Sequence, residues 1–132
     1  MSVNLKIIRM KNLFCICVLS FFFINCNKKQ AEKTITTIEL KALLAQEKIQ
    51  LMDVRTPKEI SEGFIKTAIF ANYFDADFTE IAIKQLDPTK PVYLYCRSGG
   101  RSAKSATILL EKGFEVYNVL GGYTQWEKEN MQ

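Results

Sequence analysis

The sequence contains no histidine among its 132 residues. A serine or cysteine nucleophile therefore cannot use an imidazole as its base, and no histidine is available to bind a metal. Any nucleophile in this chain has to be activated by backbone N–H groups, by a helix dipole or by fixed positive charge. The absence excludes histidine-dependent hydrolases and histidine-ligated zinc enzymes.

Two further absences narrow the function. Neither Gly-Lys-Ser nor Gly-Lys-Thr occurs in the chain, which excludes a nucleotide-binding phosphate loop. Acidic residues are absent before Cys26, whereas Lys6, Arg9 and Lys11 lie there, so the net charge of +4 falls to +1 for the remaining 15 basic and 14 acidic residues. A nearly neutral domain gives no electrostatic basis for binding nucleic acid.

The first 25 residues have the pattern of an export signal. Residues 13–24 are apolar except for one serine, a length typical of a signal peptide and short for a membrane span. We interpret residues 1–25 as a lipoprotein-type signal peptide, Cys26 as the lipidated first residue and residues 26–33 as a tether. A plain secretory signal and an uncleaved anchor are the alternatives. All three place the domain outside the cytoplasm, and the lipoprotein interpretation makes it periplasmic and membrane-tethered.

Under this interpretation, only one of the four cysteines stays in the folded domain. Cys15 and Cys17 leave with the signal peptide and Cys26 carries the lipid, so Cys96 remains alone. A single thiol cannot form an internal disulfide, and an unused thiol is a liability in an oxidising compartment. We therefore expect Cys96 to have a chemical role.

Strands and helices are predicted to alternate through residues 34–130. Strands are expected at residue 35 and at residues 50–54, 68–70, 91–95 and 116–119. Capping, proline and glycine signals predict helices that start after Thr36, at residues 57–62, 78–86 and 101–112, and after residues 121–122. This alternation predicts an α/β fold with a parallel sheet covered by helices on both faces. Cys96 follows the clearest strand, at the sheet end where sites form.

The loop after this strand has a composition suited to holding an anion. It reads Cys96-Arg97-Ser98-Gly99-Gly100-Arg101-Ser102. Ionising a thiol with a pKa near 8.5 at neutral pH requires roughly 2.7 kcal/mol. Hydrogen bonds to a charged group contribute about 1.5–3 kcal/mol, and a helix dipole contributes up to ~2. These contributions are sufficient without histidine.

Each loop residue has an expected role in this interpretation. Gly99 and Gly100 permit positive φ, which lets consecutive N–H groups converge on one anion. Arg97 and Arg101 offer planar donors to an anionic substrate, and Ser102 offers a hydroxyl to the sulfur. The alternative is a buried structural cysteine before an ordinary glycine turn, which needs neither two arginines nor two glycines.

At these residues the chain resembles the rhodanese-like family of single-domain sulfurtransferases. Three segments carry the resemblance: residues 51–59 (Leu-Met-Asp-Val-Arg-Thr-Pro-Lys-Glu), the loop 96–102, and residues 119–122 (Val-Leu-Gly-Gly) followed by Trp126. It implies a three-layer fold over residues 34–130, with a central five-stranded parallel sheet. It also implies that Cys96 carries a persulfide, cradled by the N–H groups of Arg97, Ser98, Gly99, Gly100, Arg101 and Ser102.

The resemblance extends to partners and neighbouring residues. It implies a small anionic sulfur donor such as thiosulfate. The implied acceptor is cyanide or a thiol, and that thiol can belong to a protein. The resemblance implies no cofactor and no metal. The family usually has histidine where this chain has Phe64. We expect this change to affect packing, Phe64 and Trp126 to lie in the core, and Asp53 and Arg55 to form a structural ion pair.

Two other functions use similar residues. A phosphatase or arsenate reductase also holds a low-pKa cysteine under an anion cradle, but its arginine usually falls six residues after the cysteine, whereas Arg101 falls five after Cys96. No aspartate is clearly placed as a general acid. A binding module without catalysis is the second alternative, and it has no need of an intact Cys96 loop.

Overall fold

Five short strands form one parallel sheet in the computed structural model, which describes residues 31–130. The strands are β1 (Lys33–Ile35), β2 (Gln50–Asp53), β3 (Ile69–Phe70), β4 (Val92–Tyr95) and β5 (Val116–Val119), in the order β1-β5-β4-β2-β3. Every neighbouring pair is parallel, which confirms the expected sheet. The signal peptide, Cys26 and most of the tether lie outside the described residues.

Five helices connect and cover the strands, close to their predicted positions: α2 (Thr37–Gln46), α3 (Pro57–Ser61), α4 (Phe78–Gln85), α5 (Gly100–Glu111) and α6 (Gly122–Asn130). Thr36 and Glu39 form the expected capping box at α2. Thr56 and Glu59 form a second capping box at α3, where Pro57 occupies the first turn. Within residues 31–130, no helix is both long and apolar enough to cross a membrane.

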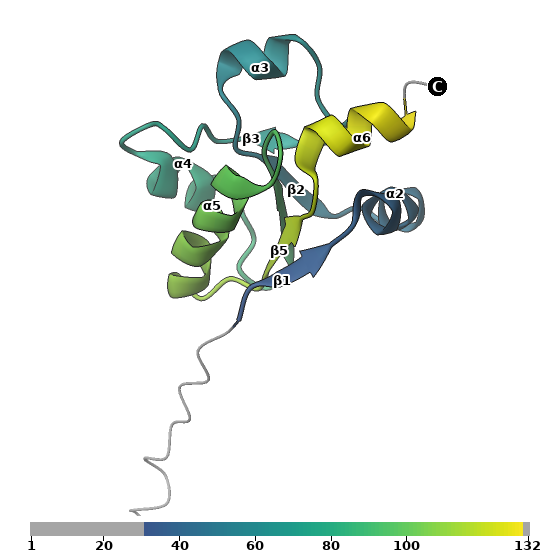
Figure 1. The fold of residues 1–132 in the computed structure, drawn as a ribbon. Coiled ribbons are helices and arrows are strands. Elements are labelled where there is room, and N and C mark those ends of the chain that lie inside the picture. Colours follow the sequence, from purple (N-terminus) through teal and green to yellow (C-terminus); the bar gives the residue numbers. More distant parts are fainter. Residues whose placement is uncertain (1–30, 131–132) are drawn as a thin grey trace, which may run out of the picture.

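The helices make two layers around the sheet (Figure 1). Helices α4 and α5 lie on one side, α2 and α6 lie on the other, and α3 lies near the carboxyl ends of the strands. Alternate residues of a strand point to opposite faces. Met52 and Leu94 therefore join one apolar cluster, and Leu51 and Tyr95 join the other. Strands β2 and β4 are buried on both faces, which fixes the position of the loop after β4.

The expectation that Phe64 lies in the core is wrong. Phe64 is 47% exposed, and its ring packs edge-on against Phe70, with 5.1 Å between centroids. The physical reason is its place in the segment between α3 and β3, where the neighbouring Ile65 is buried in its stead. Trp126 is only partly buried against the α2–α6 side of the core, so its expected core position is half right.

Candidate active site

Cys96 lies directly after β4, and its thiol points beneath the first turn of α5. Its sulfur accepts hydrogen bonds from the Gly99 N–H at 3.1 Å and from the Ser102 hydroxyl at 3.4 Å. Within the described residues it is a free cysteine, and only 1% of it is exposed. The strand and the helix start therefore hold the sulfur against several donors.

The surroundings of Cys96 favour its ionised form. Burial acts to raise the pKa of the Cys96 thiol, but hydrogen bonds from the Ser102 hydroxyl and the N–H groups of Ser102, Gly99 and Ser98 outweigh it. The pKa of Cys96 consequently lies below its ordinary value. The N-terminal end of α5 also favours negative charge at this point. A thiolate is the form that attacks sulfur or any other electrophile.

The two glycines of the loop do different work. Gly99 caps α5 with a φ of +110°, in the region that favours glycine. Gly100 begins the helix without positive φ, so only Gly99 uses the freedom that both glycines offer. The Gly99 carbonyl accepts from the Ala103 N–H at 3.0 Å and from the buried Asn118 amide at 3.3 Å, and these bonds hold the turn in place.

The two arginines of the loop meet a carboxylate that the sequence did not point to. Glu59, on α3, binds both guanidinium nitrogens of Arg101 at 2.7 and 2.8 Å, and Arg97 lies 3.6 Å from it. The Arg101 hydrogen bond, with help from Thr56, lowers the pKa of Glu59 to about 2. Arg101 is thus already paired, whereas the Arg97 side chain is 61% exposed.

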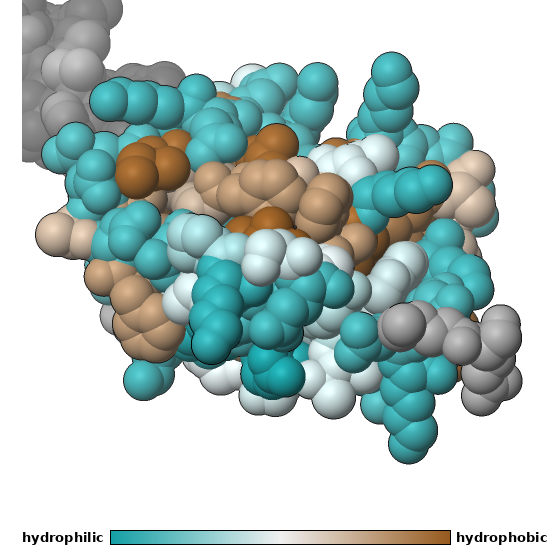
Figure 2. Space-filling view, turned by 90° about the horizontal axis from the view of Figure 1, so that it is seen from above, coloured by the Kyte–Doolittle hydropathy of each residue, from teal (hydrophilic) through white to brown (hydrophobic). Residues whose placement is uncertain are grey.

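We call Glu59, Arg97 and Arg101 the mouth of the site. Figure 2 views this end of the molecule and shows an apolar band between hydrophilic areas. Phe74, which is 65% exposed, carries the Arg101 guanidinium 5.5 Å from its ring centre. The mouth therefore offers to an arriving molecule a largely exposed cation, Arg97, a second cation, Arg101, that Glu59 neutralises more tightly, and apolar surface.

Behind the loop lies a group that we call the back wall: the buried Asp53, Arg55 and Tyr95, and the half-buried Tyr123. Arg55 and Asp53 form the expected ion pair, 2.7 Å apart and almost fully buried. The Arg55 guanidinium also lies 4.0 Å from the centre of the Tyr123 ring. The Tyr123 N–H donates to the Cys96 carbonyl at 2.8 Å, which ties α6 to the active loop.

This geometry defines a class of protein: an α/β domain with a buried cysteine of lowered pKa, held by hydrogen-bond donors in the loop at the carboxyl end of a parallel strand. Within residues 31–130, no group of three or more histidine, cysteine, aspartate or glutamate side chains is arranged to hold a metal. The family model of the rhodanese-like domain matches residues 36–129. The chain belongs to the rhodanese-like domain family.

Individual relatives agree with this assignment. The Bacillus subtilis protein YtwF is 39% identical over 98 residues, which cover 74% of this chain and 92% of YtwF. Thiosulfate sulfurtransferase 16 of Arabidopsis thaliana is 36% identical, over 61% of this chain and 75% of the plant protein. A crystal structure of a rhodanese-like domain protein from Staphylococcus aureus, 35% identical, superposes with a TM-score of 0.65 over 71% of this chain and 90% of the other. These relatives support a rhodanese-type sulfur transfer.

Proposed function

We propose that this protein transfers a sulfane sulfur through a persulfide on Cys96. The Cys96 thiolate attacks the outer sulfur of thiosulfate, the S–S bond of the donor breaks, and sulfite leaves with the electron pair. A cyanide ion or a thiolate then attacks the terminal sulfur of the persulfide. The new bond forms to the acceptor, and the Cys96 thiolate is released for another cycle.

One observation carries the proposal: the Cys96 sulfur is surrounded by donors and has a lowered pKa. A persulfide ends in a negatively charged sulfur about as large as the thiolate that it extends. The N–H groups at the start of α5 can stabilise that charge as they stabilise the thiolate. Arg97, which is the more exposed arginine, is suited to attract the anionic donor.

The position of Arg101 favours sulfur transfer over phosphoryl transfer. Phosphatase chemistry requires a guanidinium that binds the oxygens of the transferred phosphoryl group. Here both terminal nitrogens of Arg101 bind Glu59 at the side of the loop. The short loop and the paired arginine leave the cradle to backbone donors, which are sufficient for a single sulfur atom.

The proposal is tested by intact mass. The chain from Ala31 onward contains every described strand and helix, and Cys96 is its only cysteine. After reduction and treatment with thiosulfate, we expect a gain of one sulfur atom that cyanide or a thiol removes. Removal by a thiol is essential, because oxidation to sulfinic acid gives nearly the same mass and is not reversed by thiols.

The matched control is Cys96→Ser, which should gain no mass. The proposal is wrong if the reduced, folded protein takes up no sulfur from thiosulfate or from a more reactive persulfide donor. Release of phosphate from phosphate esters without sulfur uptake would instead support the phosphatase alternative. If Cys96→Ala replaces the wild-type protein in the cell without loss of function, the result would support a binding module.

We also propose that the protein is exported and held at a membrane through Cys26. The apolar run at residues 13–24 and the cysteine after it support this proposal. When the full chain is produced in a bacterium, it should enter the membrane fraction and incorporate labelled fatty acid. Cys26→Ser should do neither. Equal recovery of both forms in the soluble cytoplasm would contradict the proposal.

A further inference from the structure

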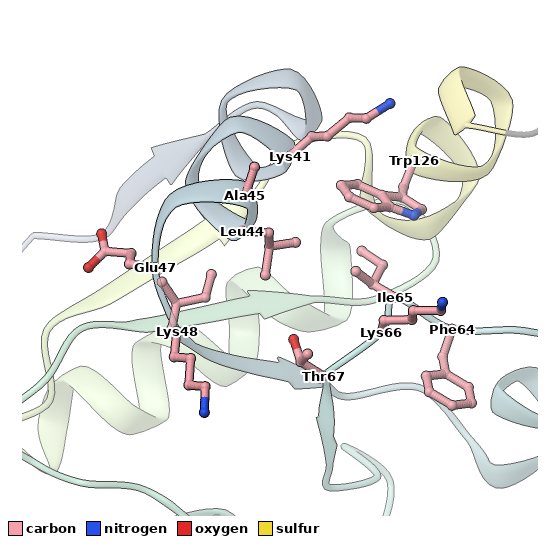
Figure 3. Close-up of a pocket in the computed structure, with 11 residues that line it drawn as sticks. Lys41, Leu44, Ala45, Glu47, Lys48, Phe64, Ile65, Lys66, Thr67 and Trp126 are labelled. Atoms are coloured by element: carbon pink, nitrogen blue, oxygen red, sulfur yellow. The ribbon is translucent and has the colours of Figure 1, made fainter.

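A second pocket lies away from the Cys96 loop, between α2, α6 and the segment that joins α3 to β3. It is a half-open depression of about 540 Å³, within the range of small-molecule sites. None of its lining residues belongs to the loop from Cys96 to Ser102. Figure 3 shows Leu44 and Ile65 facing its centre and Trp126 reaching in from α6. The sulfur-transfer reaction makes no use of this pocket.

The pocket combines an apolar interior with a positive rim. Leu44, Ile49 and Ile65 supply aliphatic surface, and the rings of Phe64 and Trp126 flank it. Its lining includes three lysines, Lys41, Lys48 and Lys66, and one carboxylate, that of Glu47. Among the described residues, none of these lysines makes a salt bridge within the chain. Their charges are therefore free to act on a ligand.

The wall of the pocket is built in an unusual backbone conformation. Thr67 has a φ of +72°, and it is the one non-glycine residue with positive φ in residues 31–130. A β-branched residue adopts this conformation only when its surroundings enforce it. Nearby, the buried Ile65 N–H donates to the Tyr95 hydroxyl at 3.1 Å. The hydrogen bond and the Thr67 conformation fix the backbone of this segment, and thereby the positions of Phe64 and Lys66 beside the pocket.

We infer that this pocket binds a small amphipathic anion, namely a carboxylate with a medium-length aliphatic chain. The chain would lie over Leu44 and Ile65 against the Trp126 ring, with its carboxylate at the lysine rim. Charge complementarity favours an anion over a neutral or cationic amphiphile of the same length. The concave shape and the apolar lining favour one bound molecule over a flat contact with a lipid surface.

The chain supplies its own probe, since Trp126 is its only tryptophan. Trp126 fluorescence should change saturably when decanoate is added below its micelle concentration to the chain from Ala31 onward. Decanol and decyltrimethylammonium test the role of charge at constant chain length. We expect decanoate to bind about tenfold more tightly than the cationic amphiphile, because three exposed lysines favour it and repel the cation.

Matched variants locate the site. The triple change Lys41→Gln, Lys48→Gln and Lys66→Gln should weaken decanoate binding about tenfold. The control triple, Lys84→Gln, Lys104→Gln and Lys112→Gln, removes three exposed lysines on or beside α4 and α5 and should leave binding unchanged. Cys96→Ser should also bind normally, so this inference and the proposed sulfur transfer fail independently.

Three outcomes would overturn the inference. The first is equal binding of decanoate and decyltrimethylammonium. The second is an equal loss of affinity in the two triple variants. The third is no response to free decanoate together with lysine-dependent binding to vesicles that contain an anionic phospholipid. That third result would make this face a membrane-contact surface.

Discussion

The back wall and the mouth of the site each contain an arginine–carboxylate pair, and the two pairs differ in burial. The Arg55 and Asp53 side chains are 2% and 0% exposed, whereas Arg101 and Glu59 are 19% and 16% exposed. Removing one partner of a buried pair is strongly destabilising, because the remaining charge stays uncompensated in a medium of low dielectric. A pair that water reaches can open at modest cost. The ion pair of the back wall therefore stabilises the fold, whereas the ion pair of the mouth can open when a substrate binds.

Asp53→Asn should cause the largest loss of stability. This change leaves the Arg55 charge buried without compensation, so we expect the free energy of unfolding to fall by about 3–5 kcal/mol. Urea unfolding followed by circular dichroism measures the loss. Glu115→Gln is the control, since it breaks an exposed pair with Lys33, 2.6 Å away, and should change stability little. Similar losses in both variants would show that burial does not distinguish the pairs.

Gly122→Ala tests the close approach of α6 to the loop that contains Cys96. A Cβ atom at Gly122 would lie 2.5 Å from the Cys96 carbonyl oxygen and 2.7 Å from that of Arg97, at a φ of +57°. We expect a loss of about 2–4 kcal/mol, from the clash and the backbone strain together.

Gly113→Ala separates these two causes. Gly113 also has positive φ, +88°, but a Cβ atom there would have no neighbour within 4 Å. We expect it to lose only about 1 kcal/mol, for strain alone. Gly122→Ala should in addition slow sulfur transfer, because the displaced carbonyls belong to the active loop. If Gly122→Ala and Gly113→Ala change stability and rate equally, the close approach of Gly122 to the Cys96 and Arg97 carbonyls is contradicted.

Local signals explain why the sequence predicted most of the fold. Capping residues, a helix-starting proline and short apolar runs act within a few residues, and all five strands were found from them. The ion pair of Asp53 and Arg55 is also local, since it joins residues two positions apart. The strand predicted before Cys96 is β4, so the position of Cys96 at the carboxyl end of the sheet is confirmed.

The parts that the sequence did not predict depend on distant contacts. Glu59 and Arg101 are 42 positions apart, and no local pattern pairs them. The one local signal at Glu59 is its spacing from Thr56, which is that of a capping box and gives no indication of a second partner. The exposure of Phe64 depends on how the segment after α3 crosses the sheet edge, and hydrophobicity alone assigned it to the core.

Glu59→Gln tests how much the ion pair at the mouth contributes to stability. The pKa of Glu59 is lowered to about 2, so the ion pair stabilises the fold above the ordinary pKa near 4.5 and loses this effect as the pH falls towards 2. After allowance for solvent screening, we expect Glu59→Gln to cost about 1 kcal/mol at neutral pH. The difference from wild type should shrink between pH 4.5 and 2. A constant difference across this range would contradict the lowered pKa.

The same variant should alter donor binding. Without the carboxylate, Arg101 is released and the mouth gains one positive charge. We expect the KM for thiosulfate to fall about two- to fivefold, and this gain to disappear at high salt. A higher KM would mean that Arg101 acts only while Glu59 holds it in place.

The last expected effect concerns the hydroxyl of Ser102, and it acts on the reactivity of Cys96 alone. Its one proton has two acceptors, the Cys96 sulfur at 3.4 Å and the Gly99 carbonyl at 3.1 Å. Ser102→Ala removes the hydroxyl donor that lowers the pKa of Cys96, while the Ala103 N–H and the Asn118 amide still hold Gly99. Below the thiol pKa, alkylation of Cys96 by iodoacetamide should therefore slow about three- to tenfold.

Ser98→Ala is the matched control for this change, because Ser98 acts on the sulfur through its backbone N–H, which alanine retains. Intact mass counts the alkylated fraction without ambiguity in the chain from Ala31 onward, where Cys96 is the only cysteine. The two variants and wild type should reach the same rate at high pH, where the thiol is ionised in all three. If Ser102→Ala leaves the pH of half-maximal rate unchanged, the hydroxyl proton belongs to Gly99, and the backbone N–H groups alone set the pKa of the nucleophile.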